Sequence, residues 1–255
     1  MRLTGERVLI TGSTSGIGKH AAMLCAREGA RVAVHGRDTQ RGTEVVDEIT
    51  QAGGEAAFLA ADLADEAACT ALIDGAATKL GGLTVLVNSA ATVGGERKNV
   101  GELDTAEWEL ALRVNLTSVA WLCRAALPHM LAAGHGSIIN VSSRQAERAS
   151  SGLAAYVASK GGLNALTRAI AVEYGRRNVR CNALSVGYVL NERRDADLSA
   201  ARRAELEAMH LTRLGRAEDV GYAIVYLASR ESEFVTGALL PVDGGGTIAR
   251  GRVLG

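Results

Sequence analysis

Short runs of apolar residues alternate along this chain with longer segments in which apolar residues recur every three or four positions. The short runs predict buried strands at 8–10, 31–34, 56–60, 83–87, 136–141, 179–184 and 239–242. The longer segments predict helices at 16–28, 39–52, 65–80, 105–133, 154–174, 199–209 and 217–229. Apolar strands that alternate with helices indicate an α/β fold, in which helices cover both faces of a parallel sheet.

No polar linker and no change of composition divides this pattern, so we expect one domain over residues 1–255. Several of the predicted helices end at glycine, the residue best suited to a left-handed cap. The segment 188–211 is different because it is rich in charge, and we expect it to form a flap rather than core.

Composition narrows the classes of function. The chain has 28 basic and 28 acidic residues, so its formal net charge of zero offers no long-range attraction to nucleic acid or to an anionic membrane. Its four cysteines form no CxxC pair and its five histidines no HExxH pattern, so we expect buried, reduced thiols and no metal site. With no signal peptide and no run of about 18 apolar residues, we expect a soluble, cytoplasmic protein.

A glycine-rich turn follows the first predicted strand and leads into the first helix. Gly12 permits the sharp turn, Gly16 lets the backbone approach a pyrophosphate, and Gly18 lets the helix pack close to the strand. The helix then offers free N–H groups and a positive dipole end to phosphate. Glycines alone would also suit a simple connecting turn, but a strand before and a helix after favour a dinucleotide site.

The end of the second strand bears on the choice of dinucleotide. An acidic residue there would bind a ribose 2′-hydroxyl, but Gly36 occupies that place and Arg37 follows. A guanidinium can pair with a 2′-phosphate, which favours NADP(H) over NAD(H). The alternative is that Arg37 is a solvated side chain and Asp38 a helix cap.

A tyrosine and a lysine stand four residues apart on the predicted helix 154–174. Tyr156 and Lys160 therefore share one face of the helix, and an ammonium near the phenol would lower the tyrosine pKa. The fifth strand ends just before Ser143, and open parallel sheets hold their reactive groups beyond the carboxyl ends of the strands. Ser143 could then hydrogen-bond the substrate oxygen that Tyr156 protonates.

Together these features resemble the short-chain dehydrogenase/reductase family over nearly the whole length of the chain. The matching positions are the 11–18 turn, Asp62, Leu63, Asn88, Val114, Asn115, Ser143, Tyr156, Lys160 and the closing segments 235–237 and 242–245. The resemblance implies a Rossmann-type doubly wound sheet of about seven strands in the order 3-2-1-4-5-6-7. It also implies a homotetramer or homodimer paired through helices 105–133 and 154–174.

The resemblance further implies a Ser–Tyr–Lys–Asn tetrad that acts on a ketone or an alcohol. Tyr156 would protonate the developing alkoxide, Ser143 would hold the same oxygen, and NADPH would deliver the hydride. Lys160 would lower the pKa of Tyr156 and bind the nicotinamide ribose, and Asn115 would anchor a proton-relaying water. The implied cofactor-binding residues are Gly12, Ser13, Thr14, Ser15, Gly16, Ile17, Gly18, Arg37, Asp62, Leu63, Asn88, Ala90, Tyr156, Lys160, Gly187, Val189 and Asn191.

Three positions depart from the family pattern. Ala91 replaces a glycine after the fourth strand, Val186 replaces a proline after the sixth, and Asn191 stands where threonine often binds the nicotinamide amide. An intact tetrad favours redox chemistry over the alternative of a dehydratase or epimerase on the same scaffold. The three departures are the only support for a further alternative, a protein that binds NADP(H) without turnover.

The substrate cleft is the least specified part of the sequence. We expect Ser143, Gln145, Tyr156 and Tyr188 to bind a small carbonyl or alcohol substrate, with segment 92–98 nearby. The basic side chains near this cleft would suit an anionic or polyhydroxylated substrate, although solvated arginines are the simpler interpretation. These side chains are Arg144, Arg193 and Arg194.

Overall fold

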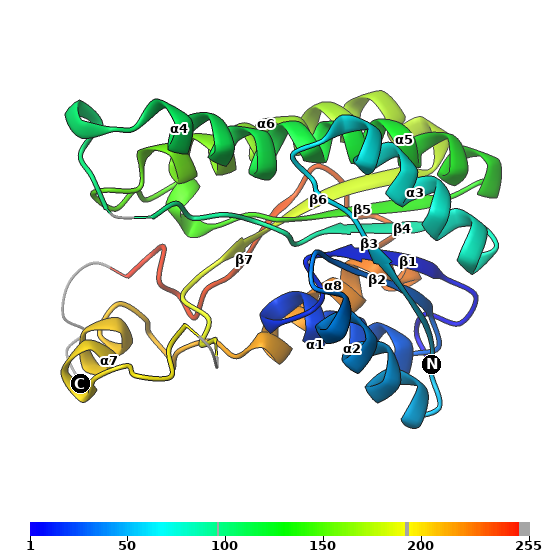
Figure 1. Ribbon diagram of the computed structural model, residues 1–255, viewed down its shortest axis with the longest axis horizontal. Helices are drawn as coiled ribbons and strands as arrows, with labels where there is room; N and C mark the ends of the chain where they lie inside the picture. Colours follow the sequence, from blue (N-terminus) through cyan, green and yellow to red (C-terminus); the bar gives the residue numbers. More distant parts are fainter. Residues whose placement is uncertain (96, 192–193, 250–255) are drawn as a thin grey trace.

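A seven-stranded parallel sheet forms the centre of the computed structural model, which describes residues 1–95, 97–191 and 194–249 (Figure 1). The strand order is β3-β2-β1-β4-β5-β6-β7, and every neighbouring pair is parallel. The strands are β1 (Arg7–Thr11), β2 (Arg31–Gly36), β3 (Glu55–Ala60), β4 (Val85–Asn88), β5 (Gly136–Val141), β6 (Val179–Val186) and β7 (Leu239–Val242). The predicted fold class and strand order are confirmed.

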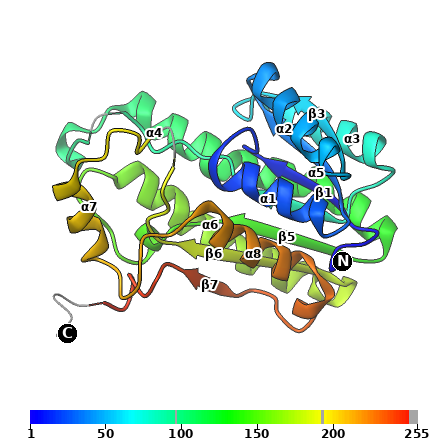
Figure 2. The same cartoon turned by 90° about the horizontal axis from the view of Figure 1, so that it is seen from below.

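Helices cover both faces of this sheet. On one face lie α1 (Gly16–Arg27), α2 (Thr39–Gln51) and α8 (Ala217–Ala228), and Figure 2 shows α1 beside α8, which pack on each other. On the other face lie α3 (Glu66–Leu80), α4 (Thr105–Leu112), α5 (Ser118–Ala133) and α6 (Ala154–Tyr174). Each face has its own buried apolar cluster.

The alternation of side chains along β1 explains why this strand contributes to both apolar clusters. Val8 and Ile10 of β1 belong to the cluster beneath α1 and α8, and Leu9 belongs to the cluster beneath α3 and α5. Successive side chains of a strand point to opposite faces, so an all-apolar run is what a sheet covered on both sides requires. At the ends of α3 and α5, Gly81 and Gly134 adopt the left-handed conformation.

The helix predicted over 105–133 contains one wider turn. Between α4 and α5, residues Arg113–Thr117 form a π-helical segment, so the helix continues without a break but with one local bulge. The whole stretch Thr105–Ala133 is long and apolar enough to meet a length and hydropathy test for a membrane span. Its packing offers another reason for that character, because α5 packs on α3 and contacts β4 and β5.

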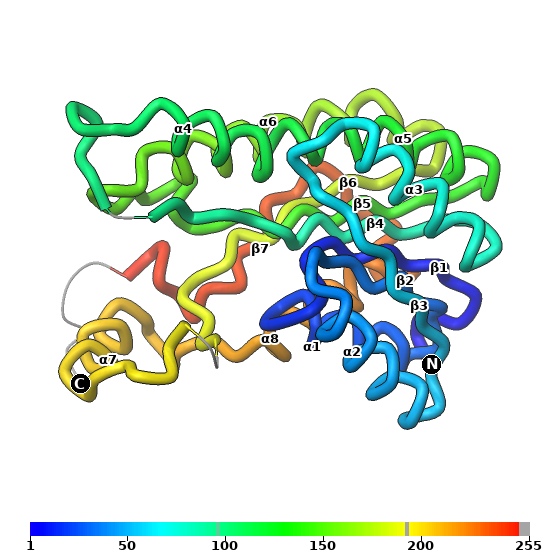
Figure 3. Tube along the Cα trace, viewed as in Figure 1, coloured from blue at the N-terminus to red at the C-terminus, as the bar shows by residue number. Residues whose placement is uncertain are grey.

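The segment after β6 departs from the sheet. The trace in Figure 3 passes from β6 to α7 (Ala200–Glu207) and then to α8, which lies in the helix layer beside α1. A single bridge between Val189 and Gly215 closes the base of this excursion. The short helix α7 thus lies within the segment predicted as a flap, 188–211. Short 3₁₀ turns occur at Val100–Glu102, Arg144–Ala146, Gly175–Arg177 and Arg230–Ser232.

Candidate active site

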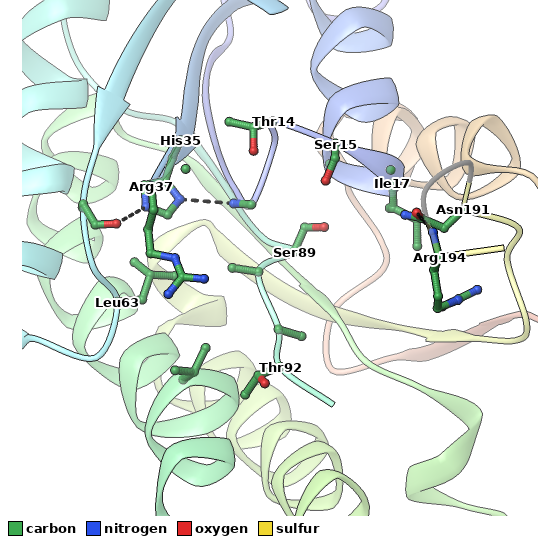
Figure 4. Close-up of a pocket in the computed structure, with 18 of the residues that line it drawn as sticks. Thr14, Ser15, Ile17, His35, Arg37, Leu63, Ser89, Thr92, Asn191 and Arg194 are labelled. Atoms are coloured by element: carbon green, nitrogen blue, oxygen red, sulfur yellow. Dashed lines mark hydrogen bonds between the residues drawn. The ribbon is translucent and has the colours of Figure 1, made fainter. Parts of the chain in front are cut away.

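A pocket of about 560 Å³ opens at the carboxyl ends of β1 to β4 (Figure 4). Arg37 and Leu63 lie toward one end of it, and Asn191 and Arg194 lie toward the other. Of the expected cofactor residues, those that line it are Gly12, Thr14, Ser15, Gly16, Ile17, Gly18, Arg37, Asp62, Leu63, Ala90, Val189 and Asn191. Sequence patterns from five separate segments thus meet in one cavity.

The glycines of the first turn are required by its geometry. Gly12 and Gly16 have φ values of +66° and +52°, in the left-handed region. A Cβ on Gly12 would lie 2.8 Å from the Ala90 Cα, and one on Gly18 would collide with the Gly12 carbonyl oxygen. Ser15 precedes α1 without capping it through its side chain, so the first N–H groups of α1 keep no side-chain acceptor there. This turn and open helix end fit the pyrophosphate of a dinucleotide.

The end of the pocket at β2 has little room for an acidic residue on that strand. A Cβ on Gly36 would lie 2.5 Å from the Thr14 Cγ2 and 2.9 Å from its Oγ1. Arg37 follows in the pocket wall, while the Asp38 side chain accepts a hydrogen bond from the Arg41 N–H and caps α2. The sequence-based alternative for Asp38, a helix cap, is thereby confirmed, and it leaves Arg37 as the charged group at the end of β2.

The proposed reactive side chains come together beyond β5. Ser143, 7% exposed, follows β5, and its hydroxyl accepts a hydrogen bond of 3.2 Å from the Gln145 N–H. Ser143 lies close enough to Tyr156, in the first turn of α6, for its hydroxyl to favour a lower pKa of the tyrosine. The Lys160 Nζ donates a 2.7 Å hydrogen bond to the Val141 carbonyl and lies 5.7 Å from the centroid of the Tyr156 ring.

Burial shifts the pKa values of both Tyr156 and Lys160. Burial raises the pKa of Tyr156, and this effect is opposed by the Ser143 hydroxyl and by the positive charge of Arg194. In this structure the Lys160 ammonium donates to the Val141 carbonyl, and its expected effect on the tyrosine pKa stays a prediction. Burial also lowers the pKa of Lys160 to about 8.

Asn115 lies in the π-helical segment and is fully buried. Its side chain accepts a 2.8 Å hydrogen bond from the Thr92 N–H and donates one of 2.7 Å to the Thr92 carbonyl. It also donates to the Ser159 hydroxyl at 3.1 Å, one residue from Lys160. Asn115 therefore fastens the loop after β4 to α6, directly beside the reactive group.

Some expected cofactor residues lie behind the pocket rather than in its lining. Ser13 donates from its hydroxyl to the Ile10 carbonyl at 2.7 Å, and Asn88 donates to the Asn140 side chain at 2.8 Å, so both support the turn and sheet. The lining of the 560 Å³ pocket also lacks Tyr156, Lys160 and Gly187. Lining residues outside the expected cofactor set are His35, Gly36, Ala61, Ser89, Ala91, Thr92, Leu110, Val114, Leu190 and Arg194.

Non-covalent contacts join the residues at the start of segment 188–211. The Tyr188 hydroxyl donates to Asp195 at 2.7 Å, so in this structure it is engaged within the flap. Arg194 also pairs with Asp195 at 2.7 Å and stacks 4.7 Å from the centroid of the Tyr188 ring. Gln145 donates to the Ser150 hydroxyl at 3.0 Å. The expectation for Arg193 falls outside the described residues.

Comparison with known proteins places this geometry in a family. A family model described as enoyl-(acyl carrier protein) reductase matches residues 12–247. The chain is 40% identical to a cis-4-hydroxycyclohexanecarboxylate dehydrogenase of Sinomonas cyclohexanicum, over 95% of this chain and 97% of that protein. It is 35% identical to a 7alpha-hydroxysteroid dehydrogenase of Clostridium sardiniense, over 96% and 94% of the two chains.

A solved structure shares the fold. The gluconate 5-dehydrogenase of Burkholderia cenocepacia, in complex with NADP and tartrate, superimposes with a TM-score of 0.90 at 34% identity, covering 98% of both chains. The chain belongs to the short-chain dehydrogenase/reductase family, whose members oxidise alcohols or reduce carbonyls with a nicotinamide cofactor.

Proposed function

We propose that this protein is an NADP(H)-dependent oxidoreductase that interconverts a ketone or aldehyde with the corresponding alcohol. The observation that carries the proposal is that Ser143, which is buried, lies beside Tyr156 at the carboxyl edge of the sheet and acts on the tyrosine hydroxyl. Two hydroxyl groups there can serve one substrate oxygen, beside a cavity of about 560 Å³ that suits a dinucleotide.

Each side chain has a distinct role in this proposal. The Tyr156 hydroxyl gives its proton to the oxygen of the carbonyl as that oxygen becomes an alkoxide, and Ser143 donates a hydrogen bond to the same atom. When bound, the reduced nicotinamide supplies the hydride. Lys160, with a pKa near 8, can hold or release a proton close to neutral pH and so restore the proton of Tyr156. Asn115 keeps the loop after β4 in contact with α6.

The preference for NADP(H) rests on the adenosine end of the pocket. The crowding of Gly36 by Thr14 leaves little space for a carboxylate at the end of β2, and Arg37 lies in the pocket wall as a partner for a 2′-phosphate. The complex of the Burkholderia relative with NADP is consistent with this preference. Arg37→Ala should weaken NADPH binding about tenfold and leave NADH binding unchanged. Arg27→Ala, which removes an exposed arginine of α1, is the matched control.

The test is a spectrophotometric screen of NADPH and NADH against carbonyl compounds and alcohols, chosen to include hydroxysteroids, substituted cyclohexanols and sugar acids. Tyr156→Phe should abolish turnover while the protein still binds NADPH, and Tyr174→Phe at the far end of α6 should keep full activity. Faster turnover with NADH would overturn the cofactor assignment. Product formation without a change of redox state would favour a dehydratase or epimerase, and tight NADPH binding without any turnover would favour a sensor.

Assembly and location belong to the same proposal. We propose a homodimer or homotetramer formed through α4, α5 and α6, and action in the cytoplasm, where the four buried thiols stay reduced. The mass of the protein in solution, measured by light scattering, tests the assembly, and a monomer at micromolar concentration would refute it.

A further inference from the structure

A buried histidine lines the pocket between the glycine turn after β1 and the chain after β3. His35 lies near the carboxyl end of β2, is 3% exposed, and lines the pocket of about 560 Å³. Figure 4 shows its ring between the glycine turn on one side and the chain after β3 on the other, with a hydrogen bond to each. Neither the tetrad nor the preference for a dinucleotide uses this residue.

The two hydrogen bonds define the state of the ring. The backbone N–H of Gly12 can only donate, so the Nδ1 atom of His35, 3.1 Å away, must be the acceptor. The carbonyl oxygen of Ala61 can only accept, so the Nε2 atom, at 3.2 Å, must carry the proton. His35 is therefore a neutral imidazole with its proton on Nε2, and burial, which lowers its pKa to about 4, keeps it neutral at physiological pH.

The backbone of His35 joins the same turn. Its carbonyl accepts a 2.8 Å hydrogen bond from the Ser13 N–H, and its own N–H donates to the Ser13 hydroxyl at 2.9 Å. The Nδ1 atom is the only hydrogen-bond partner of the Gly12 amide anywhere in residues 1–95, 97–191 and 194–249. The backbone of His35 and its ring therefore both hold the glycine turn, and within the described residues the Gly12 N–H is bonded by the ring alone.

The tolerance for movement of this turn is small. Gly12 already lies so close to the loop after β4 that a Cβ would come within 2.8 Å of the Ala90 Cα, and Gly18 packs against the Gly12 carbonyl. A shift of Gly12 would therefore move the floor on which the pyrophosphate lies and the first turn of α1 together.

We propose that His35 is a positioning residue of the cofactor pocket, which sets the glycine turn by accepting from Gly12 while it is anchored by Ala61. The inference rests on the proposed function in one respect, namely that the ligand of this pocket is a nicotinamide dinucleotide. It assigns to His35 an effect on cofactor affinity and none on the chemistry around Tyr156.

Two amide substitutions remove the two hydrogen bonds of the His35 ring one at a time. In His35→Asn the amide oxygen stands as many bonds from Cα as Nδ1, so it can still accept from Gly12, while the bond to Ala61 is lost. In His35→Gln the amide nitrogen stands as far from Cα as Nε2, so it can still donate to Ala61, while the Gly12 amide loses its acceptor. We expect the Kd for NADP⁺, measured by calorimetry, to rise about tenfold in His35→Gln and no more than about threefold in His35→Asn.

Further readouts distinguish positioning from a general loss of structure. At saturating cofactor, kcat should stay within about twofold of wild type in both variants, so the change appears in KM for the cofactor. In the wild type at pH 7, nitrogen NMR shifts should identify one imidazole with its proton on Nε2, and this signal should vanish in His35→Gln. His129→Asn, on the exposed side of α5, is the control.

The outcomes separate this inference from the proposed function. If the wild type binds neither NADP⁺ nor NAD⁺, the proposed function fails. If it binds a dinucleotide but both variants bind as tightly as wild type, or if the ring is protonated on Nδ1 at pH 7, the role assigned to His35 is wrong while the function stands.

Discussion

Replacing Lys160 by methionine should stabilise the folded protein while it abolishes turnover. Lys160 is 2% exposed, and in the described part of the chain no carboxylate forms an ion pair with it. Its ammonium is held by a single 2.7 Å hydrogen bond to the Val141 carbonyl. A buried charge with one neutral partner is costly, which is why burial lowers the pKa of Lys160 to about 8.

The size of the effect follows from that pKa. A fall from 10.5 to about 8 corresponds to about 3 kcal/mol at roughly 1.4 kcal/mol per unit, and the folded state bears this cost in full below pH 8. As the pH rises from 8 to 10.5, folded Lys160 loses its proton before the unfolded chain does, so the cost disappears. Methionine removes the charge but leaves the Val141 carbonyl unpaired at a cost of about 1 kcal/mol, so the net gain at pH 7 is about 2 kcal/mol.

The assay is urea unfolding of the cofactor-free protein at pH 7, 9 and 10, with Lys79→Met as the control for loss of an exposed lysine. We expect Lys160→Met to exceed wild type by about 2 kcal/mol at pH 7 and the difference to shrink steadily toward pH 10. The reasoning fails if Lys160→Met is no more stable than wild type at pH 7, or if the difference is the same at pH 10. Either result would mean that other groups compensate the buried charge.

Three further predictions concern thiols, packing and the flap. Burial raises the pKa of each thiol, so at pH 8 the native protein should not react with a thiol reagent within minutes, whereas the urea-unfolded chain should react at Cys25, Cys69, Cys123 and Cys181. Gly42→Ala should lower the unfolding free energy by about 1–3 kcal/mol because its Cβ would collide with the Phe58 ring, while Gly161→Ala, with nothing within 4 Å, should raise it by up to about 1 kcal/mol. Asp195→Asn removes the charge that pairs with Arg194, and limited proteolysis should then cut within 188–211 faster than in wild type; an unchanged rate would contradict the role of this pair.

The fold was predictable because the information for it is local. The alternation of Val8, Leu9 and Ile10 between the two core clusters follows from strand geometry alone, and the strands that alternate with helices leave few alternatives to a parallel doubly wound sheet. The places of the candidate reactive residues were predictable for the same reason. Tyr156 and Lys160 share one helix, and Ser143 stands two residues after the carboxyl end of β5.

The direction of side chains was less predictable. Spacing of four residues puts Tyr156 and Lys160 on one face of α6, but it does not decide whether the ammonium turns toward the phenol or toward the end of β5, where it meets the Val141 carbonyl. The contacts of Asn115, in the π-helical segment, were also not predictable from local sequence. The Asn115 side chain bonds to Thr92 and Ser159, which are distant from it in sequence.

The role of His35 in the pocket could not be predicted until the order of the strands was known. Nothing in the run Val34-His35-Gly36 separates a buried polar side chain from a solvated one. In the order β3-β2-β1, however, β2 is the only strand with the glycine turn on one side and the end of β3 on the other. A side chain near its carboxyl end can therefore bond to both neighbours at once, and it must offer an acceptor to the Gly12 amide and a donor to the Ala61 carbonyl. A neutral imidazole meets both demands within a single rigid ring, which is why we expect neither amide variant to replace it fully.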